Sequence, residues 1–299
     1  MSALTATEQP LVAPGRSAGL LDVLRWRFLL KLLVRKELRV RYRGSVLGLL
    51  WSYVKPGVQL LVYYVAMGKF LGLERSLPNF VIYLFAGIVV VNFFGEVLGN
   101  TTRSIVANSD LVKKIYLPRE LFPVSSVWVA IVHLLPQTLV LVLAALAIGW
   151  RPGVTNVIGA LASLGIAGLL ALGFGLVFGA VNVLFRDAEN IVDLVLMMAT
   201  WLSPVLYTFN QVTDTVAKDG LPQWIPTAYQ ANPLTAAVEL AHYGFWVPTN
   251  GVAEAFHGGQ TMPNNFAAWG VVGLAASLLS IVIGQLVFRR LEGRFAQEL

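Results

Sequence analysis

The feature of this sequence that most constrains its fold is a series of long apolar runs that contain few charged residues. Hydrophobic residues make up 57% of the chain and charged residues only 13%, well below the roughly 25% charged residues of soluble domains. About 20 consecutive apolar residues are enough to cross a bilayer as a helix. The pattern therefore predicts an integral membrane protein. We expect an all-α fold, because a helix pairs its own backbone groups in lipid and these runs lack the alternation of membrane barrel strands.

The spacing of the runs predicts one domain of six membrane-spanning helices over residues 44–299, preceded by a flexible tail over 1–21 and a basic segment over 22–43. The expected spans are 45–72, 79–107, 121–149, 156–184, 191–210 and 266–288. Region 211–265 is long for a loop, and its apolar stretches are too short to cross the bilayer. Short re-entrant or interfacial helices are expected there.

Lys and Arg residues are distributed unevenly between the two sides of the expected spans. Seventeen of them flank the spans on the side of the termini, against four on the other side. Because basic residues are enriched in cytoplasmic loops, both termini are predicted to lie in the cytoplasm.

The segment 22–43 has the pattern of an amphipathic helix rather than of a span. Its apolar face holds Val23, Trp26, Leu30, Leu33 and Val34, and basic residues occupy much of the remaining surface. A helix of this kind lies in the membrane interface, where anionic lipid attracts it. The alternative is a basic topogenic signal with no further role.

A second charged segment, 108–123, separates two long apolar runs and is expected on the cytoplasmic side. It can form a short amphipathic helix, with Leu111 and Ile115 on one face and Lys113 and Lys114 on the other, that ends at Pro118. A surface helix between two spans could bind a cytoplasmic partner. A plain solvated loop is equally consistent with the spacing.

Polar residues inside the first two expected spans repeat at helical spacing. Such residues are costly in a membrane and usually face a bundle interior or an aqueous path. We expect them to line a conduit, and aromatic residues near them would suit the C–H faces of sugar rings. The alternatives are polar packing between helices, including a Lys55–Glu96 pair, and an interfacial aromatic belt. The expected lining residues are Tyr53, Lys55, Gln59, Tyr63, Asn92, Glu96 and Asn100.

The motifs that the sequence lacks exclude several kinds of chemistry. There is no cysteine, and the three histidines, His133, His242 and His257, show no metal-ligand spacing. No phosphate-binding loop and no catalytic Ser/His/Asp set is present. We therefore expect no catalytic residue, metal or cofactor in this chain. If ATP with Mg²⁺ drives its activity, a separate subunit must hydrolyse it.

Five short motifs together resemble the membrane subunit of ABC-2-type polysaccharide exporters, the family of O-antigen, teichoic acid and mycobacterial galactan export permeases. The resemblance extends from about residue 25 to residue 290. The motifs are 41–51 (RYRGSVLGLLW), 113–120 (KKIYLPRE), 185–187 (FRD), 203–207 (SPVLY) and 232–235 (NPLT). Each is modest alone, but their order and the number of expected spans make the set fairly specific.

The resemblance implies a homodimeric channel in the bacterial plasma (inner) membrane, bound to two copies of a cytoplasmic ABC ATPase. It implies a coupling helix after the second span, contact of the N-terminal helix with the ATPase, and short gate helices between the fifth and sixth spans. The residues expected to meet the ATPase are Asn108, Asp110, Leu111, Lys113, Lys114, Ile115, Tyr116, Arg35 and Arg39.

The same resemblance implies export of an undecaprenyl-diphosphate-linked glycan, and the Ala-, Val-, Gly- and Arg-rich composition slightly favours a galactan. Arg41, Arg43 and Arg103 are candidates to receive the lipid diphosphate, with anchoring at the inner leaflet as the alternative. Other functions remain as alternatives: an ABC-2-type exporter of drugs or simple lipids, an ion-coupled transporter, and a membrane glycosyltransferase. The last two would require repeats or an acidic cluster that the sequence does not show.

Overall fold

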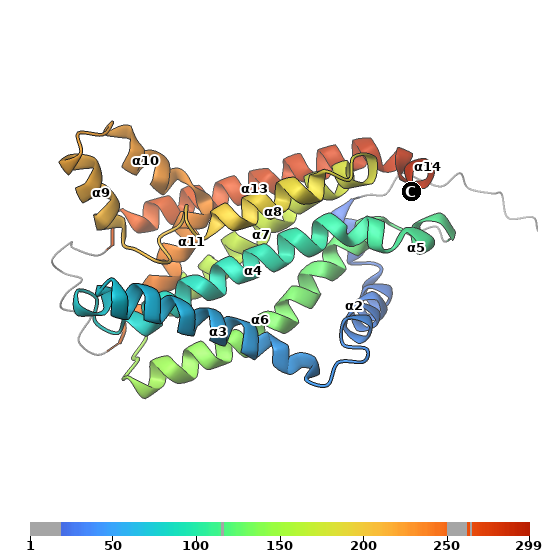
Figure 1. Cartoon of the computed structure of the whole chain (residues 1–299). Coiled ribbons are helices and arrows are strands. Elements are labelled where there is room, and N and C mark those ends of the chain that lie inside the picture. The colour runs from blue at the N-terminus through green and yellow to red at the C-terminus, as the bar shows by residue number, and fades with distance from the viewer. Residues whose placement is uncertain (1–18, 115–116, 250–261, 264) are drawn as a thin grey trace, which may run out of the picture.

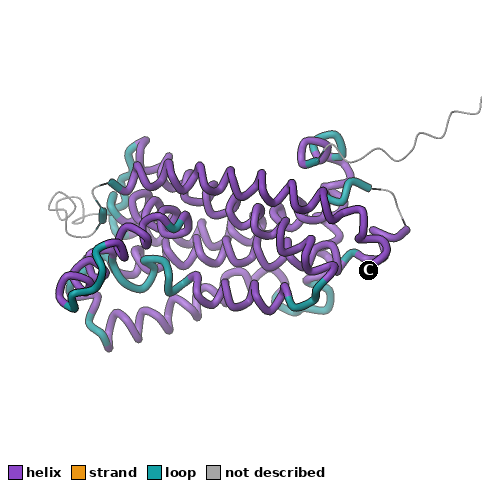
Figure 2. The backbone as a smooth tube through the Cα atoms, turned by 90° about the horizontal axis from the view of Figure 1, so that it is seen from above, coloured by secondary structure: helices purple, strands orange, loops and turns teal. Residues whose placement is uncertain are grey.

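The structure, a computed structural model, describes residues 19–114, 117–249, 262–263 and 265–299. These residues form helices joined by loops, with no strand among them (Figure 2). The all-α prediction is therefore confirmed. Four helices are long and apolar enough to cross a membrane. They are α4 (Phe80–Ala107), α6 (Leu121–Ala147), α7 (Val154–Leu184) and α13 (Phe266–Leu291), each within a few residues of an expected span.

Helix α4 lies at the centre of the bundle, where α6, α7, α8 and α11 surround it (Figure 1). Glycines allow α7 to approach both α4 and α13 closely. A Cβ atom on Gly175 would lie 2.6 Å from Cβ of Thr101 in α4, and one on Gly173 would lie 2.2 Å from Oγ of Ser280 in α13. In lipid, where apolar surface is already out of water, such close packing holds helices together.

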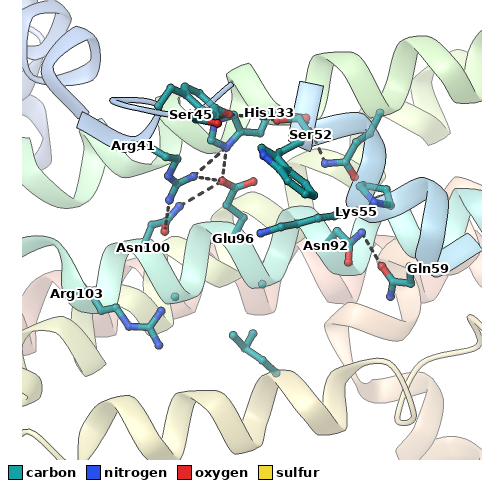
Figure 3. A pocket seen from close by; sticks show the side chains of 17 residues that line it. Arg41, Ser45, Ser52, Lys55, Gln59, Asn92, Glu96, Asn100, Arg103 and His133 are labelled. Carbon is teal, nitrogen blue, oxygen red and sulfur yellow. Dashed lines mark hydrogen bonds and ion pairs between the residues drawn. The ribbon is translucent and has the colours of Figure 1, made fainter. Parts of the chain in front are cut away.

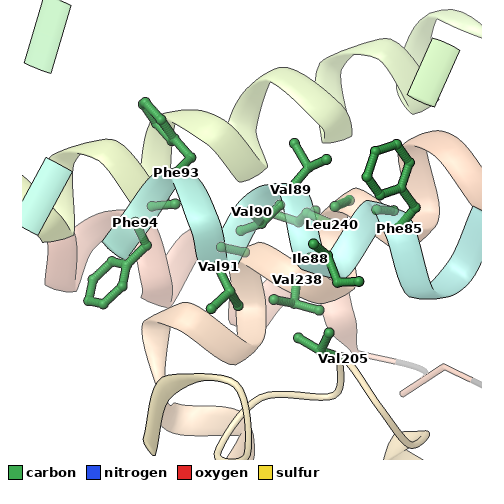
Figure 4. Close-up of a cluster of buried hydrophobic side chains, with 14 of the residues drawn as sticks. Phe85, Ile88, Val89, Val90, Val91, Phe93, Phe94, Val205, Val238 and Leu240 are labelled. Atoms are coloured by element: carbon green, nitrogen blue, oxygen red, sulfur yellow. The ribbon is translucent and has the colours of Figure 1, made fainter. Parts of the chain in front are cut away.

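Apolar packing around α4 extends to the segment after α8 and to α11. Val205 and Val238 belong to one cluster of buried side chains with Ile88 of α4, and both lie near Ile88 (Figure 4). A Cβ atom on Gly87 would lie 3.1 Å from Cγ1 of Val205, so α4 has little room for a larger residue here. The cluster holds the segment 200–208 against the central helix.

The first expected span, 45–72, is helical from Gly48 to Phe70, but it is not a regular α-helix throughout. Helix α3 (Trp51–Tyr63) follows a 3₁₀ turn, η1 (Gly48–Leu50), and continues as π-helical turns in η2 (Tyr64–Phe70).

The fifth expected span, 191–210, differs from the structure. Helix α8 (Ala188–Ala199) has 12 residues, about 18 Å at 1.5 Å per residue, and is too short to cross a bilayer core of about 30 Å. Turns then lead through Pro204, which cannot continue a helix. The Tyr83 hydroxyl donates to the backbone oxygens of Pro204 and Tyr207, both at 2.9 Å, and stabilises this non-helical segment.

Short helices lie at the two ends of the bundle (Figure 1). At one end are α1 (Leu20–Val23), α2 (Arg27–Arg41), α5 (Ser109–Lys114), η5 (Glu292–Arg294) and α14 (Phe295–Glu298). At the other end lie η3 (Leu73–Arg75), α9 (Phe209–Lys218), α10 (Trp224–Ala231), α11 (Pro233–Ala241) and η4 (His242–Trp246). Short helices expected within 211–265 are thus present up to Trp246, whereas 250–261 and 264 lie outside the described residues, as does most of the expected tail.

Candidate functional site: a polar groove along α4

A groove with a volume of about 930 Å³ runs along α4, between α3, α6, α8 and the end of α2 (Figure 3). Its lining residues on α4, from Asn92 to Arg103, lie in the half of that helix that leads to α5. Polar side chains from four elements line it. They are Arg41 and Tyr42 at the end of α2, Ser52, Lys55 and Gln59 on α3, Asn92, Glu96, Asn100 and Arg103 on α4, and His133 and Gln137 on α6.

Glu96 is the centre of a charged network in this groove (Figure 3). Its Oε1 lies 2.6 Å from Nη1 of Arg41, and the same oxygen contacts Nδ1 of His133. Arg41 also donates through Nη2 to Oδ1 of Asn100 at 2.9 Å. On the far side of the imidazole, the hydroxyl of Tyr42 lies 2.7 Å from Nε2 of His133. Two consecutive residues at the end of α2 therefore hold side chains of both α4 and α6.

The network is partly hydrated rather than sealed. The side chain of Glu96 is 22% exposed and that of Arg41 is 39% exposed. A carboxylate with an arginine partner and some access to water stays ionised at modest cost. Because the pair is open to the groove, another anion can reach Arg41.

A second arginine at the groove is also paired. Arg103 donates through Nε to Oε2 of Glu189 at 3.1 Å and through Nη2 to Oδ1 of Asp193 at 2.9 Å, which ties α4 to α8. Further along α4, on the side away from both arginines, Nδ2 of Asn92 donates to Oε1 of Gln59 at 3.1 Å and joins α4 to α3 (Figure 3). The paired charges thus lie toward one end of the groove and these amides toward the other.

The alternative of a Lys55–Glu96 pair is not what the structure shows, because Glu96 pairs with Arg41 and His133 instead. Lys55 lines the groove, and its ammonium has no ion-pair or hydrogen-bond partner among the described residues. It is exposed on the groove side of α3, so a ligand can reach it without displacing a carboxylate.

The structure brings together most, but not all, of the expected lining residues. Lys55, Gln59, Asn92, Glu96 and Asn100 share the groove. Tyr53 and Tyr63 do not line it, and Tyr63 packs at the edge of the hydrophobic core instead. Of the three arginines expected to receive a diphosphate, Arg41 and Arg103 line the groove, whereas Arg43 is exposed outside it.

His133 is the site residue that sequence reasoning missed. It is buried in α6 with both ring nitrogens in contact with polar groups, although metal spacing alone gave it no role. The available signal was its position four residues before Gln137 within a long apolar run, the same spacing that drew attention to α4. Among the described residues, no group of three or more His, Asp or Glu could hold a metal ion.

A second polar junction joins α2 to the start of α5. Nζ of Lys36 donates to Oδ1 of Asn108 at 2.5 Å, and Nδ2 of Asn108 donates to the Ser104 backbone oxygen at 2.8 Å. The Ser125 hydroxyl of α6 donates to Oε1 of Glu37 at 3.1 Å. Burial raises the pKa of the Glu37 carboxyl, against the opposing effect of the Ser125 hydrogen bond. The helix α2 is thus attached to the bundle both here and at Glu96.

The residues expected to meet an ATPase lie around this junction. Asn108 is buried and Leu111 is half-buried, which places their helix against the bundle. The exposed members are Arg35, Arg39, Asp110, Lys113 and Lys114, whereas Ile115 and Tyr116 lie outside the described residues. Helix α5 therefore has a packed face and a charged exposed face, as the spacing predicted.

The long apolar helices and the polar groove among them define the chain as a multi-helix membrane protein of the permease type. A family model described as ABC-2 type transporter matches residues 29–246, and the chain belongs to this family. The matched region begins in α2 and ends in η4, so it includes the groove, α5 and the short helices of the opposite end.

Curated relatives are similar over most of the chain. It is 27% identical over 270 residues to the O-antigen export system permease protein RfbA of Klebsiella pneumoniae, covering 90% of this chain and 94% of the relative. The identity is 28% over 216 residues to RfbA of Myxococcus xanthus, covering 70% and 82% of the two chains. For the polysialic acid transport protein KpsM of Escherichia coli it is 23% over 215 residues, covering 69% and 76%.

Proposed function

We propose that this chain is the membrane-spanning subunit of an ATP-driven exporter that moves a lipid-linked polysaccharide from the cytoplasm outward. The relatives named for O-antigen export and polysialic acid transport support a polysaccharide cargo. Two copies of the chain would bind two copies of a cytoplasmic ATPase, which supplies ATP hydrolysis with Mg²⁺. In this arrangement both termini lie in the cytoplasm, α2 and α5 face the ATPase, and α9 to α11 form the outer gate.

The observation that carries the proposal is the polar groove beside α4. Its amides, hydroxyls and charges are groups that sugar hydroxyls bind, whereas an exporter of drugs or simple lipids needs a more apolar cavity. The two helices that border the groove expose apolar side chains, among them Val58 and Leu61 on α3 and Leu194 and Met197 on α8. A second copy packed against these faces would close two grooves into one channel.

The charges in the groove suit the diphosphate of an undecaprenyl-linked glycan. Arginine binds phosphate with the same paired geometry that it uses for carboxylate, so a diphosphate can replace Glu96 at Arg41. Lys55 needs no displacement, because it has no partner among the described residues. Exposed Arg43 would attract anionic headgroups at the membrane surface. Composition favours a galactan among the possible glycans.

The groove is connected to the coupling segment through α2. Lys36 contacts Asn108 at the start of α5, and Arg41 contacts Glu96 inside the groove. A displacement of α2 and α5 by the ATPase would therefore reach Glu96 directly. Binding of a diphosphate to Arg41 would in turn release Glu96 and loosen α2.

Depletion of the protein in its host tests this function. We expect lipid-linked polysaccharide to accumulate in the plasma membrane, where a sugar-reactive label added to intact cells cannot reach it. Restoring the protein should restore labelling. Normal amounts of surface polysaccharide in depleted cells, with no accumulation inside, would contradict the proposal.

A further inference from the structure

A second glutamate–histidine pair lies at the opposite end of the bundle from α2 and α5, away from the groove. Glu239 in α11 is 3% exposed and His242 in η4 is fully buried. The His242 ring stacks on the Tyr83 ring of α4, with 3.8 Å between ring centroids, and Trp246 packs edge-on against Tyr83 at 5.2 Å. These aromatic contacts fix the imidazole in place.

The tautomer of His242 follows from its contact with α4. Its Nε2 lies 3.1 Å from the backbone oxygen of Tyr83, and a carbonyl oxygen can only accept a hydrogen bond. Nε2 therefore carries the hydrogen. Neutral imidazole has one N–H group, so Nδ1 then presents a lone pair, and this atom lies 3.9 Å from Oε2 of Glu239.

The surroundings of Glu239 provide no donor for a carboxylate. Neither oxygen of Glu239, nor Nδ1 of His242, has a hydrogen-bond partner among the described residues. An unpaired buried carboxylate is very costly, and it would also face the lone pair of Nδ1. One proton removes both costs, because a protonated carboxyl is neutral, and closing the 3.9 Å gap to hydrogen-bond distance lets it donate to Nδ1.

Among the described elements that pack against α11, no cation lies beside Glu239 to neutralise its carboxylate in place of this proton. Helices α4, α7, α10 and α13 and the turns of η4 pack against α11. Tyr83, Tyr229 and Tyr207 are the ionisable groups near the pair, and α7 contains no ionisable residue. The basic residues of α13, Arg289 and Arg290, stand in its last turn at the far end of the bundle. Tyr243 in η4 donates to Thr155.

We propose that Glu239 and His242 form a buried site for one proton, which Glu239 carries and directs to Nδ1 of His242, and that this proton keeps α11 seated against α4. The consequence reaches the segment after α8. Nδ2 of Asn232 and Oγ1 of Thr235 both donate to the Leu202 backbone oxygen, at 3.1 and 3.2 Å. Loss of the proton would therefore loosen α11 together with the segment 200–208, and this end of the bundle becomes sensitive to pH.

Infrared difference spectroscopy of the full-length protein in detergent tests the site directly. We expect the wild type at pH 7 to show the C=O band of a protonated carboxyl that is absent from Glu239→Gln. Glu74→Gln is the matched control at the same end of the bundle. Its salt bridge with Lys69 at 2.7 Å keeps Glu74 ionised, so this variant should remove no such band. A wild-type spectrum without a protonated carboxyl assigned to Glu239 overturns the proposal.

His242→Gln keeps the test decisive if Glu239→Gln does not fold. It replaces the Nδ1 acceptor with an amide oxygen, so the frequency of the Glu239 band should shift because its hydrogen-bond acceptor changes. An unshifted band means that Glu239 does not donate to His242 and contradicts the assignment.

Thermal unfolding across pH measures the effect of the proton on packing. At pH values above the ordinary carboxyl range, the folded protein keeps a proton on Glu239 that the unfolded chain has lost. The free energy of unfolding therefore falls as pH rises. Relative to Glu239→Gln, the wild-type melting temperature should fall by about 2 °C per pH unit in that window. A constant difference between the two proteins at every pH contradicts a buried proton.

Discussion

Two glutamate–histidine pairs lie at opposite ends of the same bundle, and their surroundings give them different charges. Glu96 has a cation, Arg41, at 2.6 Å and lies in a groove that water can enter. Glu239 has no cation beside it among the described residues, and its side chain is 4% exposed. The first carboxyl is stabilised as an anion. The second avoids the cost of a buried charge by keeping a proton.

This difference separates a pair that can exchange partners from one that cannot. Arg41 can leave Glu96 for another anion because both side chains face the groove. His242 and Glu239 are closed in by α4, Tyr83 and Trp246. A bound substrate can therefore act on the first pair, whereas only a proton can act on the second.

The largest effect is expected from removal of Arg41. Arg41→Ala leaves the Glu96 carboxylate without its cation and detaches the end of α2 from α4. Because Arg41 is 39% exposed, we expect a loss of only about 1–2 kcal/mol in stability, and at least roughly a tenfold loss of export. Arg43→Ala, which alters an exposed arginine outside the groove, is the control. Equal export by both variants would show that the charge at 41 has no special role.

Replacing the glutamate of each pair with glutamine tests whether the two carboxyls differ in charge. Glu96→Gln removes an ionised partner from Arg41 and should cost about 1–2 kcal/mol in unfolding free energy at pH 7. Glu239→Gln is neutral in both the folded and the unfolded chain, so at pH 7 it avoids the proton uptake that wild-type folding requires and should raise the free energy of unfolding, by up to about 1.4 kcal/mol for each pH unit above the ordinary carboxyl range. Chemical unfolding of the two variants in parallel measures both values. The reverse order of effects would contradict the assigned charges.

Lys55 should affect ligand binding without affecting the fold. Since its ammonium has no partner among the described residues, Lys55→Ala should change stability by no more than about 0.5 kcal/mol. We expect binding of a diphosphate-linked glycan to weaken by roughly tenfold, the effect of losing one charge-assisted hydrogen bond. Lys55→Arg, which keeps the charge, should bind nearly normally. Unchanged affinity in Lys55→Ala would exclude this lysine from the binding site.

The smallest effect is expected at the junction of α2 with α6. Burial raises the pKa of Glu37, so the folded protein holds this proton to a higher pH than the unfolded chain does. Stability from Glu37 is therefore fully present below the ordinary carboxyl range and is lost as pH rises through the folded pKa. Glu37→Gln should flatten the fall in melting temperature between about pH 5 and 7 by a few °C at most. An unchanged slope would show that Glu37 is ionised throughout.

Local patterns predicted the parts of the structure that depend on local physics. The lengths of the apolar runs predicted the four long helices α4, α6, α7 and α13. The four-residue spacing of Asn92, Glu96 and Asn100 predicted that they share one face of α4, and all three line the groove. The shortness of α8 depends on distant contacts, because Tyr83 stabilises the segment around Pro204 from more than 100 residues away. No periodicity within 191–210 could report that contact.

The partners within the site were equally inaccessible to local patterns. Arg41 and Glu96 are 55 residues apart in sequence, and His133 joins them from a third helix. Sequence spacing offered only Lys55 as an alternative partner for Glu96, because both lie on the polar faces of the first two expected spans. The choice of Arg41 instead depends on where the end of α2 meets the bundle, which is a tertiary property.

Cysteine accessibility in the groove tests the central claim that substrate passes along α4. The chain contains no cysteine, so a single Asn92→Cys substitution can be labelled without background, with the buried Ser277→Cys between α13 and α7 as control. In the complex with its ATPase, we predict that a water-soluble thiol reagent modifies residue 92 and not residue 277, and that lipid-linked polysaccharide slows the modification at 92. If residue 92 is modified equally fast with and without an actively exported polysaccharide, the substrate does not pass along this part of α4.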